Sequence, residues 1–226
     1  MTQRSKELHF FPGEKLLLWV VDAKVEVRAE AWGGEPPQPG VQYNVMAPRR
    51  TTPGRYVIHS YEPYRTKTWV YSQIAWGTPI AKGPNDTILH PAAPGQAPSK
   101  VLTDKQGNPL SAKEIEQEHF TIFGRSGFPH TWVFNDFGPW SVRYFRDKNG
   151  NRRLDRGEHL SGEMIHTTPD NEGQTAQGSP VTLDYSHGCV HIKPLARDLF
   201  HRKGAFTKGT AFIIHSYQAR LPRAWR

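Results

Sequence analysis

The feature that most limits the possible folds is a series of short segments in which apolar and polar residues alternate, most of them bounded by Gly or Pro. The clearest spans 10–31, where an apolar run at 16–21 is followed by strict alternation. A side-chain period of two is that of a β-strand with one buried face, so this segment predicts a pair of strands. Further strands are predicted at 55–59, 68–74, 131–134, 140–145 and 211–216.

The composition supports a β protein. Gly (20) and Pro (19) fill 39 of the 226 positions, and 12% of the residues are aromatic. Such a chain is rich in turns and still has large side chains for a packed core. We therefore predict a mainly β sandwich or irregular barrel with one or two short helices, and a single domain over 1–226.

Two short helices and one insertion complete the predicted outline. Ser111 and Glu114 have the spacing of a capping box, which predicts a helix after Ser111. A second helix is predicted over 194–203, with Pro at its first position and Gly204 ending it. Its core-facing residues would be Leu195, Leu199 and Phe200. The stretch at about 84–128 is predicted to be a Pro- and Gly-rich insertion, because Pro, Gly, Ala and Asn are frequent between Pro84 and Pro109.

The net charge and the hydropathy limit the binding partners and cellular locations that are possible. The net charge is +8, yet no zinc-finger, helix-turn-helix or RNP pattern accompanies it, so specific nucleic-acid binding is disfavoured. An anionic envelope polymer or a merely solvated basic face remain as explanations. The longest apolar run, at 16–21, is too short for a membrane span or a signal-peptide core. No signal peptide is visible, so the protein is either cytoplasmic or has lost an export signal.

The only cysteine lies in the sequence Ser186-His187-Gly188-Cys189-Val190-His191. One cysteine cannot form an intramolecular disulfide, so a disulfide scaffold is excluded and the redox compartment stays open. Free cysteine is often a small buried apolar residue. Beside imidazole groups it can instead lose its proton and attack a carbonyl carbon as thiolate.

A second candidate for chemistry is His166. Apolar residues lead into it and Pro169 follows, so it should lie at the end of a strand, where reactive groups are common. Nineteen residues separate it from Ser186. A lone histidine is more often a surface or core residue whose hydrogen bonds serve only the structure. His166 is therefore a catalytic candidate only in combination with Cys189.

Together these residues resemble the catalytic domain of the L,D-transpeptidase (YkuD-like) family, in which a histidine is followed, after a spacer, by Ser/Thr-His-Gly-Cys. The spacer here is at the long end of the family's range. The stretch 50–58, Arg-Thr-Thr-Pro-Gly-Arg-Tyr-Val-Ile, is similar to a Thr-Pro-Gly strand entry of the same family. The resemblance spans about 16–216, except for 84–128.

The resemblance implies a mechanism. Cys189 would attack a carbonyl of a peptidoglycan stem peptide and form an acyl-enzyme, while His166 moves the protons. His187 would hold the loop in shape, and backbone N–H groups around Gly188 and Cys189 would stabilise the oxyanion. The implied substrate-binding residues are Ser186, Thr167, Gly178 and His191.

His191 departs from the family pattern, because most members have arginine or asparagine two residues after the cysteine. A branch with histidine there resembles enzymes that link L-alanine to diaminopimelate, a 1,3 crosslink, instead of the usual 3,3 crosslink. His191 would either help to define the donor site or only pack against its neighbours.

Residues 147–158 have the donor spacing of an EF-hand calcium loop. Its oxygen donors would be Asp147, Asn149, Asn151, Asp155 and Glu158. Arg152 stands where that loop needs glycine, and no helix is predicted before it. The alternative interpretation is a polar hairpin turn rich in Asp and Asn.

Three function classes are consistent with these observations: a transpeptidase, a hydrolase that uses water with the same residues, and a non-catalytic wall-binding module. The presence of both His166 and Cys189 disfavours the third. We expect peptidoglycan stem peptides as partners, a monomer, no cofactor, no nucleic acid and no membrane span. The expected location is the periplasm or cell envelope, if an export signal has been removed.

Overall fold

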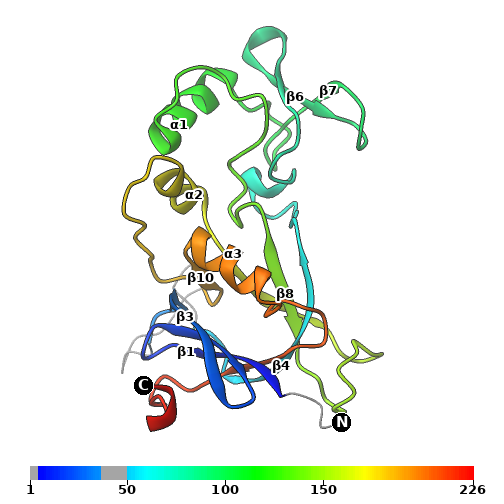
Figure 1. The fold of residues 1–226 in the computed structure, drawn as a ribbon. Coiled ribbons are helices and arrows are strands. Elements are labelled where there is room, and N and C mark those ends of the chain that lie inside the picture. The colour runs from blue at the N-terminus through cyan, green and yellow to red at the C-terminus, as the bar shows by residue number, and fades with distance from the viewer. Residues whose placement is uncertain (1–4, 37–49) are drawn as a thin grey trace, which may run out of the picture. The chain divides into compact units, whose positions relative to one another are not determined.

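The computed structural model describes residues 5–36 and 50–226 (Figure 1). The chain divides into two compact units. Of the described residues, the first contains 5–36, 50–62, 141–166 and 182–226, and the second contains 63–140 and 167–181. The chain therefore leaves the first unit and returns to it twice, and the predicted insertion at 84–128 belongs to the second unit.

Among the described residues, eight strands of the first unit close into a barrel, in the order β1-β11-β4-β8-β9-β10-β3-β2. Their bounds are β1 Lys6–Phe11, β2 Leu16–Val21, β3 Lys24–Trp32, β4 Gly54–Glu62, β8 Ser141–Phe145, β9 Leu160–His166, β10 Val190–Ile192 and β11 Ala211–Ile214. The pairs β1–β11 and β9–β10 are parallel, and the other pairs are antiparallel. The predicted mainly β, barrel-like fold is confirmed.

The hairpin between β2 and β3 shows how the sequence sets the register. Val21 pairs with Lys24, which leaves Asp22 and Ala23 as a two-residue loop. Both loop residues have positive φ, 49° and 63°. Positive φ at both central positions defines a type I′ turn, whose twist matches that of the flanking strands. A bulge between Trp19 and Val20 then shifts the pairing along the rest of the hairpin.

Alternation along the strands fills the barrel with large side chains. Tyr144 packs edge to face against Tyr56 and Phe212, with ring centroids 5.1 and 5.0 Å apart. Full burial of a side chain of this size stabilises the fold by roughly 1.5–3 kcal/mol. Helix α3 (Pro194–Arg202) adds the fully buried Phe200 to the same core.

The prediction for the faces of α3 was partly wrong. Phe200 is buried and Leu199 packs partly against the core, but Leu195 is 73% exposed. Leu195 lies in the first turn of this nine-residue helix. A residue one position from Pro194, which is buried, lies about 100° round the helix and so leaves the buried face.

The second unit has its own core and a three-stranded sheet. Its elements are the 3₁₀-helices η1 Val70–Ser72 and η2 Pro84–Asp86, the strands β5 Ala81–Lys82, β6 Ile88–Pro91 and β7 Pro98–Val101, and the helices α1 Ala112–Phe123 and α2 Pro169–Ala176. A further 3₁₀-helix, η3 (Arg223–Trp225), ends the first unit. Trp132, Phe134 and Ile115 are buried in the core of the second unit. The capping of α1 is confirmed, since the Ser111 hydroxyl accepts a hydrogen bond from the Glu114 N–H at 3.1 Å.

Two predicted strands of the second unit are absent from the described residues. The segment 68–74 contains η1 instead of a strand, and 131–134 has only an isolated bridge between Thr131 and Pro79. Side chains satisfy backbone groups there in place of a neighbouring strand. The Trp132 indole N–H donates to the Tyr71 carbonyl at 2.7 Å, and the Asn135 side-chain amide donates to the Ile74 carbonyl at 2.9 Å.

The described residues form three α-helices, one more than predicted. The additional helix, α2, has no apolar stripe, so periodicity did not reveal it. Its local signals are the Thr168 hydroxyl, which accepts from the Asn171 N–H at 3.3 Å, and Pro169 at the first position. None of the helices that the structure describes is long and apolar enough to cross a bilayer.

Candidate active site

Strand pairing brings the two predicted catalytic segments together. β9 ends at His166, and it runs parallel to β10 with His166 paired to His191 and Ile165 paired to Val190. Cys189 directly precedes β10, so in this register it lies beside Met164, two residues before His166. A hydrogen bond from the Met164 backbone reaches the Cys189 thiol. The prediction that His166 lies at a strand end is confirmed.

The turn that holds Cys189 is fixed from inside by Ser186. The Ser186 hydroxyl donates to the Cys189 carbonyl and accepts from the Gly188 N–H at 3.0 Å. The Ser186 backbone N–H donates to the Gly33 carbonyl at 2.9 Å. Ser186 is buried. The hydroxyl predicted to contact substrate therefore holds the turn in this structure.

Gly188 is required by both conformation and space. Its φ is +118°, a region that side-chain-bearing residues rarely adopt. A Cβ at this position would lie 3.3 Å from Glu163 Cγ and 3.5 Å from the Arg50 carbonyl oxygen. Because the Gly188 N–H already donates to Ser186, the Cys189 N–H is the stronger of the two predicted oxyanion donors.

The thiol of Cys189 is protonated at rest. Burial is the largest influence and raises its pKa to about 11, the charge of Glu163 raises it further, and the Met164 hydrogen bond and Arg143 oppose the rise. A half-buried thiol with such a pKa is almost entirely protonated at neutral pH, and only a small fraction is thiolate. Nucleophilic attack would therefore need a base that removes the proton during the reaction.

Glu163, which the sequence analysis missed, lies directly behind the turn. Its carboxylate accepts from the Thr52 hydroxyl at 2.6 Å, the Thr52 N–H at 3.1 Å and the Tyr144 hydroxyl at 3.3 Å. Burial raises the pKa of Glu163, and the Thr52 and Tyr144 hydrogen bonds oppose that rise. Burial followed by the Glu163 charge raises the pKa of Tyr144, which keeps its phenol as a donor.

The stretch 50–58 supports the same turn from the other side. The Thr51 hydroxyl is fully buried and accepts from the Gly34 N–H at 2.8 Å. The Tyr217 hydroxyl donates to the Gly34 carbonyl at 2.6 Å. The Ser186 N–H donates to Gly33, the residue before Gly34. Thr51 therefore holds the backbone that Ser186 contacts, and Thr52 holds the Glu163 carboxylate.

His166 and His191 form an aromatic pair. Their ring centroids are 4.8 Å apart with 74° between the planes, and His166 is buried. His191 Nδ1 lies 3.1 Å from the Asp184 carbonyl oxygen. A carbonyl only accepts, so Nδ1 carries the proton and Nε2 holds a lone pair. Burial lowers the pKa of His191, more than Asp184 raises it, so the ring is neutral near pH 7.

The contacts described above assign no role to the remaining predicted residues, His187, Thr167 and Gly178. His187 is exposed. Thr167 and Gly178 belong to the second unit, where the Thr167 hydroxyl donates to Glu172 at 2.6 Å and the Gly178 N–H donates to the Thr175 carbonyl at 3.1 Å. Their substrate-binding roles stay predictions.

The predicted calcium donors are engaged within their own loop. Asp147 accepts from the Gly150 and Arg152 N–H groups at 2.8 and 2.9 Å, and Glu158 accepts from the Lys148 N–H at 2.7 Å. Asp155 accepts from the side-chain amides of Asn149 and Asn151. In the described part of the chain, no three His, Cys, Asp or Glu side chains are grouped to hold a metal ion. Calcium binding stays a prediction.

No family model and no curated protein matches the chain. Among solved structures, three similar ones are L,D-transpeptidases. That of Xylanimonas cellulosilytica is 12% identical with a TM-score of 0.38 over 95% of this chain and 62% of its own. L,D-transpeptidase 1 of Mycobacterium tuberculosis is 12% identical with a TM-score of 0.35, over 93% and 62%. The enzyme of Mycobacterium smegmatis is 12% identical with a TM-score of 0.38, over 94% and 59%.

The chain thus spans about three fifths of the length of these structures.

Proposed function

We propose that this chain is a cysteine-dependent L,D-transpeptidase that acts on peptidoglycan stem peptides. The observation that carries the proposal is the parallel pairing of β9 and β10, in which His166 pairs with His191 and Cys189 lies opposite Met164, two residues before His166. A thiol and an imidazole on paired strands, two residues apart in register, are the parts that nucleophilic acyl transfer needs. Neither requires a cofactor.

In the proposed reaction, His166 takes the proton from Cys189 Sγ as the sulfur attacks the donor carbonyl carbon. The resulting oxyanion is stabilised by the Cys189 N–H. Collapse of this intermediate breaks the scissile C–N bond, and His166 returns the proton to the leaving amine. The product of this half-reaction is a thioester on Cys189.

The second half-reaction releases the enzyme. An acceptor amine loses a proton to His166 and attacks the thioester, and Cys189 leaves as thiolate and regains the proton. With water as acceptor, the same steps give hydrolysis of the donor peptide. The raised pKa of Cys189 fits this order of events, because the thiol stays protonated until His166 and a substrate carbonyl are both in place.

The position of His191 favours a 1,3 crosslink, from L-alanine to a diaminopimelate amine. An arginine there would place a fixed positive charge beside His166 and would lower the pKa of the base. The neutral His191 places no positive charge beside His166 and so does not lower the pKa of that base. Its Nε2 can accept a hydrogen bond, whereas arginine can only donate. A donor site with this neighbour would accept a differently placed carboxylate or backbone group.

The proposal is tested by incubating the purified protein with defined disaccharide-peptides and separating the products by mass. Dimers indicate a transpeptidase, shortened monomers a hydrolase, and unchanged peptides a non-catalytic wall-binding module. Fragmentation spectra of the dimers locate the new bond. Dimers dominated by 3,3 links would reject the role of His191 in donor choice and would leave the catalytic role of Cys189 standing.

We further propose that the protein works as a monomer in the periplasm or cell envelope, where its substrate lies. Net charge of +8 suits an anionic wall environment.

A further inference from the structure

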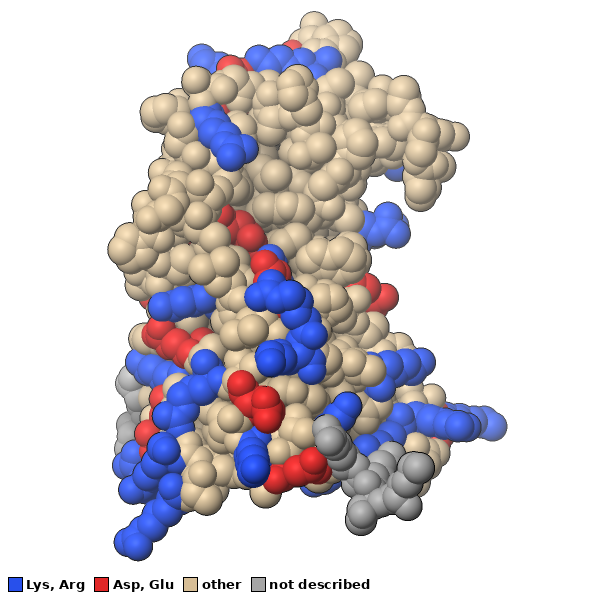
Figure 2. All heavy atoms as spheres, in the orientation of Figure 1, with Lys and Arg blue, Asp and Glu red and all other residues tan. Residues whose placement is uncertain are grey.

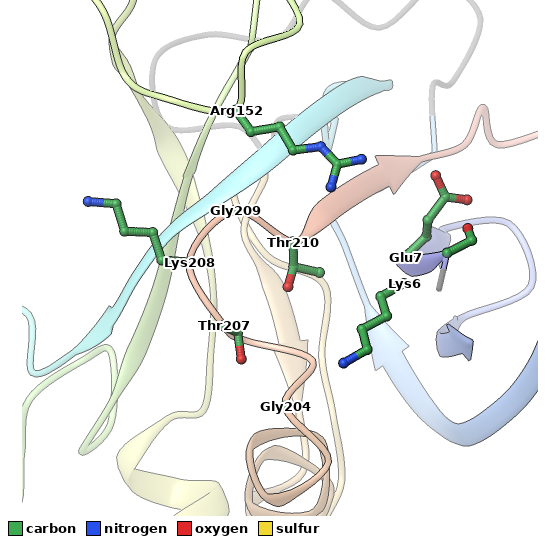
Figure 3. Close-up of a pocket in the computed structure, with 9 residues that line it drawn as sticks. Lys6, Glu7, Arg152, Gly204, Thr207, Lys208, Gly209 and Thr210 are labelled. Carbon is green, nitrogen blue, oxygen red and sulfur yellow. The ribbon is translucent and has the colours of Figure 1, made fainter. Parts of the chain in front are cut away.

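A cavity of about 470 Å³ opens on the first unit between β1, the loop 147–158 and the turn before β11. Three cations (Lys6, Arg152 and Lys208), three hydroxyl residues (Ser5, Thr207 and Thr210) and one carboxylate (Glu7) line it (Figure 3). No aromatic side chain lines it. Lys and Arg gather over the barrel unit on the face shown in Figure 2.

The single carboxylate of this cavity is already neutralised. Arg55 Nη2 lies 3.0 Å from Glu7 Oε1 and supplies the neutralising charge. His9 Nε2 lies 3.4 Å from Glu7 Oε2, but burial lowers the pKa of that ring. No acidic side chain among the described residues forms an ion pair with Arg152 or Lys6. The lining therefore keeps an excess of positive charge.

Arg152 occupies its position against the preference of its backbone. Its φ is +60°, in the left-handed region that favours glycine, and its N–H is held by Asp147 at 2.9 Å. This is the position where a calcium loop would need glycine. A residue kept in such a conformation often serves a function, because the strain must be offset by the surrounding structure. Figure 3 shows the Arg152 side chain extending from the loop towards Thr210.

The donors that this cavity offers are side chains. The N–H groups of Gly209 and Thr210 donate to the Ile58 and Thr207 carbonyls, so these backbone amides are engaged. A guanidinium fork, primary amines and threonine hydroxyls remain, and together they match the several acceptor oxygens of a phosphate group. Lys208 is turned away from the other two cations in Figure 3, and its long side chain can rotate towards a ligand.

We propose that this cavity binds a phosphate-type oxyanion, either free phosphate or the phosphodiester of a larger molecule, and that Arg152 is its principal ligand. The role of the loop 147–158 is then to present the Arg152 guanidinium to this anion. This site is separate from the chemistry of Cys189 and does not depend on it.

The test is a titration of the purified chain with inorganic phosphate, dimethyl phosphate and acetate at matched ionic strength, followed by calorimetry or by amide NMR shifts. Three variants are compared with wild type: Arg152→Gly, Lys6→Gln and, as matched control, Arg153→Gln. Arg153 is exposed on the same loop but does not line the cavity. Glycine at 152 relieves the backbone strain, so this variant should melt at or above the wild-type temperature.

We expect wild type to bind phosphate, with shifts at Thr207 and Thr210. Arg152→Gly should bind about tenfold more weakly, as expected for loss of one charge-assisted hydrogen bond, while Arg153→Gln stays near wild type. Binding of dimethyl phosphate would identify a phosphodiester as the ligand, and binding of inorganic phosphate alone would identify a free or terminal phosphate. No saturable binding, equal binding of acetate, or an equal loss in Arg153→Gln would overturn the proposal.

Discussion

The imidazole rings of His166 and His191 meet edge to face, with centroids 4.8 Å apart and 74° between the planes. The strand register places them side by side, and the Asp184 carbonyl fixes the orientation of His191 through Nδ1 at 3.1 Å. We propose that His191 positions the ring of His166, the proposed base. The residue that departs from the family pattern contacts the residue that would move the proton.

His191→Phe keeps a flat ring against His166 but removes the hydrogen bond to Asp184. We expect kcat to fall about tenfold, because small displacements of a catalytic group are costly, with little change in KM. The pH dependence of kcat should shift as well, since the surroundings of His166 change. His191→Asn, which can still donate to the carbonyl, should recover part of the loss. Full activity of the Phe variant with an unchanged pH profile would remove His191 from the mechanism.

The negative charge of Glu163 raises the pKa of Cys189, so Glu163→Gln should lower it. The sole cysteine makes this measurable, because the rate of alkylation by iodoacetamide follows the thiolate fraction. In wild type the rate should keep rising up to about pH 11. In the variant the whole curve should move to lower pH. Glu62→Gln, at an exposed carboxylate on β4, is the control, and coincident curves for all three proteins would reject the electrostatic link.

Gly188→Ala should damage the site more than the fold. The strain at φ +118° costs about 1–3 kcal/mol, and the new methyl group also presses on Glu163 at 3.3 Å. Displacement of the turn should reduce activity by about 10²-fold, as removal of an oxyanion donor does. Gly150→Ala is the matched control, because Gly150 also has positive φ, 79°, with nothing within 4 Å of a Cβ. Equal activity of the two variants would contradict the proposed role of the turn.

A histidine pair remote from these groups makes stability depend on pH. His9 Nδ1 lies 3.0 Å from His215 Nε2, and His215 stacks on Phe11 with centroids 3.8 Å apart. Burial, and then the charge of His9, lowers the pKa of His215 to about 4. Burial also lowers the pKa of His9, more than Glu7 raises it.

Below pH 6.5 the unfolded chain binds protons at His9 and His215, whereas burial keeps these rings neutral in the folded chain. Stability should therefore be complete above pH 6.5 and fall as the pH drops towards about 4. A decrease of a few degrees in the melting temperature is expected, because solvent screens a half-buried group. His215→Phe should flatten this dependence, while the exposed His159→Gln should leave it unchanged. A wild-type slope in the Phe variant would assign the pH dependence to other groups.

The sequence was most informative where one local pattern decides the structure. Period-two alternation identified β2, β3, β4, β8 and β11 of the barrel, and the apolar residues before His166 placed it at the end of β9. No strand was predicted at β1 or β10. The same pattern failed at 68–74, because alternation reports which side chains are buried and not what satisfies the backbone. There the Asn135 side chain and the Trp132 indole bind carbonyls that a neighbouring strand would otherwise bind.

Glu163 shows why part of the site could not be predicted. Along the chain it is one carboxylate among 21 acidic residues, with no motif around it. Its position behind the turn results from three contacts that are distant in sequence: Thr52, Tyr144 and the space left by Gly188. A Gly in the motif does indicate that something approaches closely, but only the fold shows what it is.

Acylation of Cys189 can be detected by mass spectrometry of the intact protein and of its Cys189-containing peptide. Wild type, Cys189→Ala and His166→Ala are each mixed with a stem-peptide donor without acceptor and quenched in acid, which preserves a thioester. Wild type should gain the mass of the donor acyl group on the peptide that contains Cys189, and His166→Ala should gain it far more slowly. Cys189→Ala should gain nothing. An adduct on the Cys189→Ala chain, or products from wild type without any adduct on Cys189, would show that Cys189 is not the nucleophile.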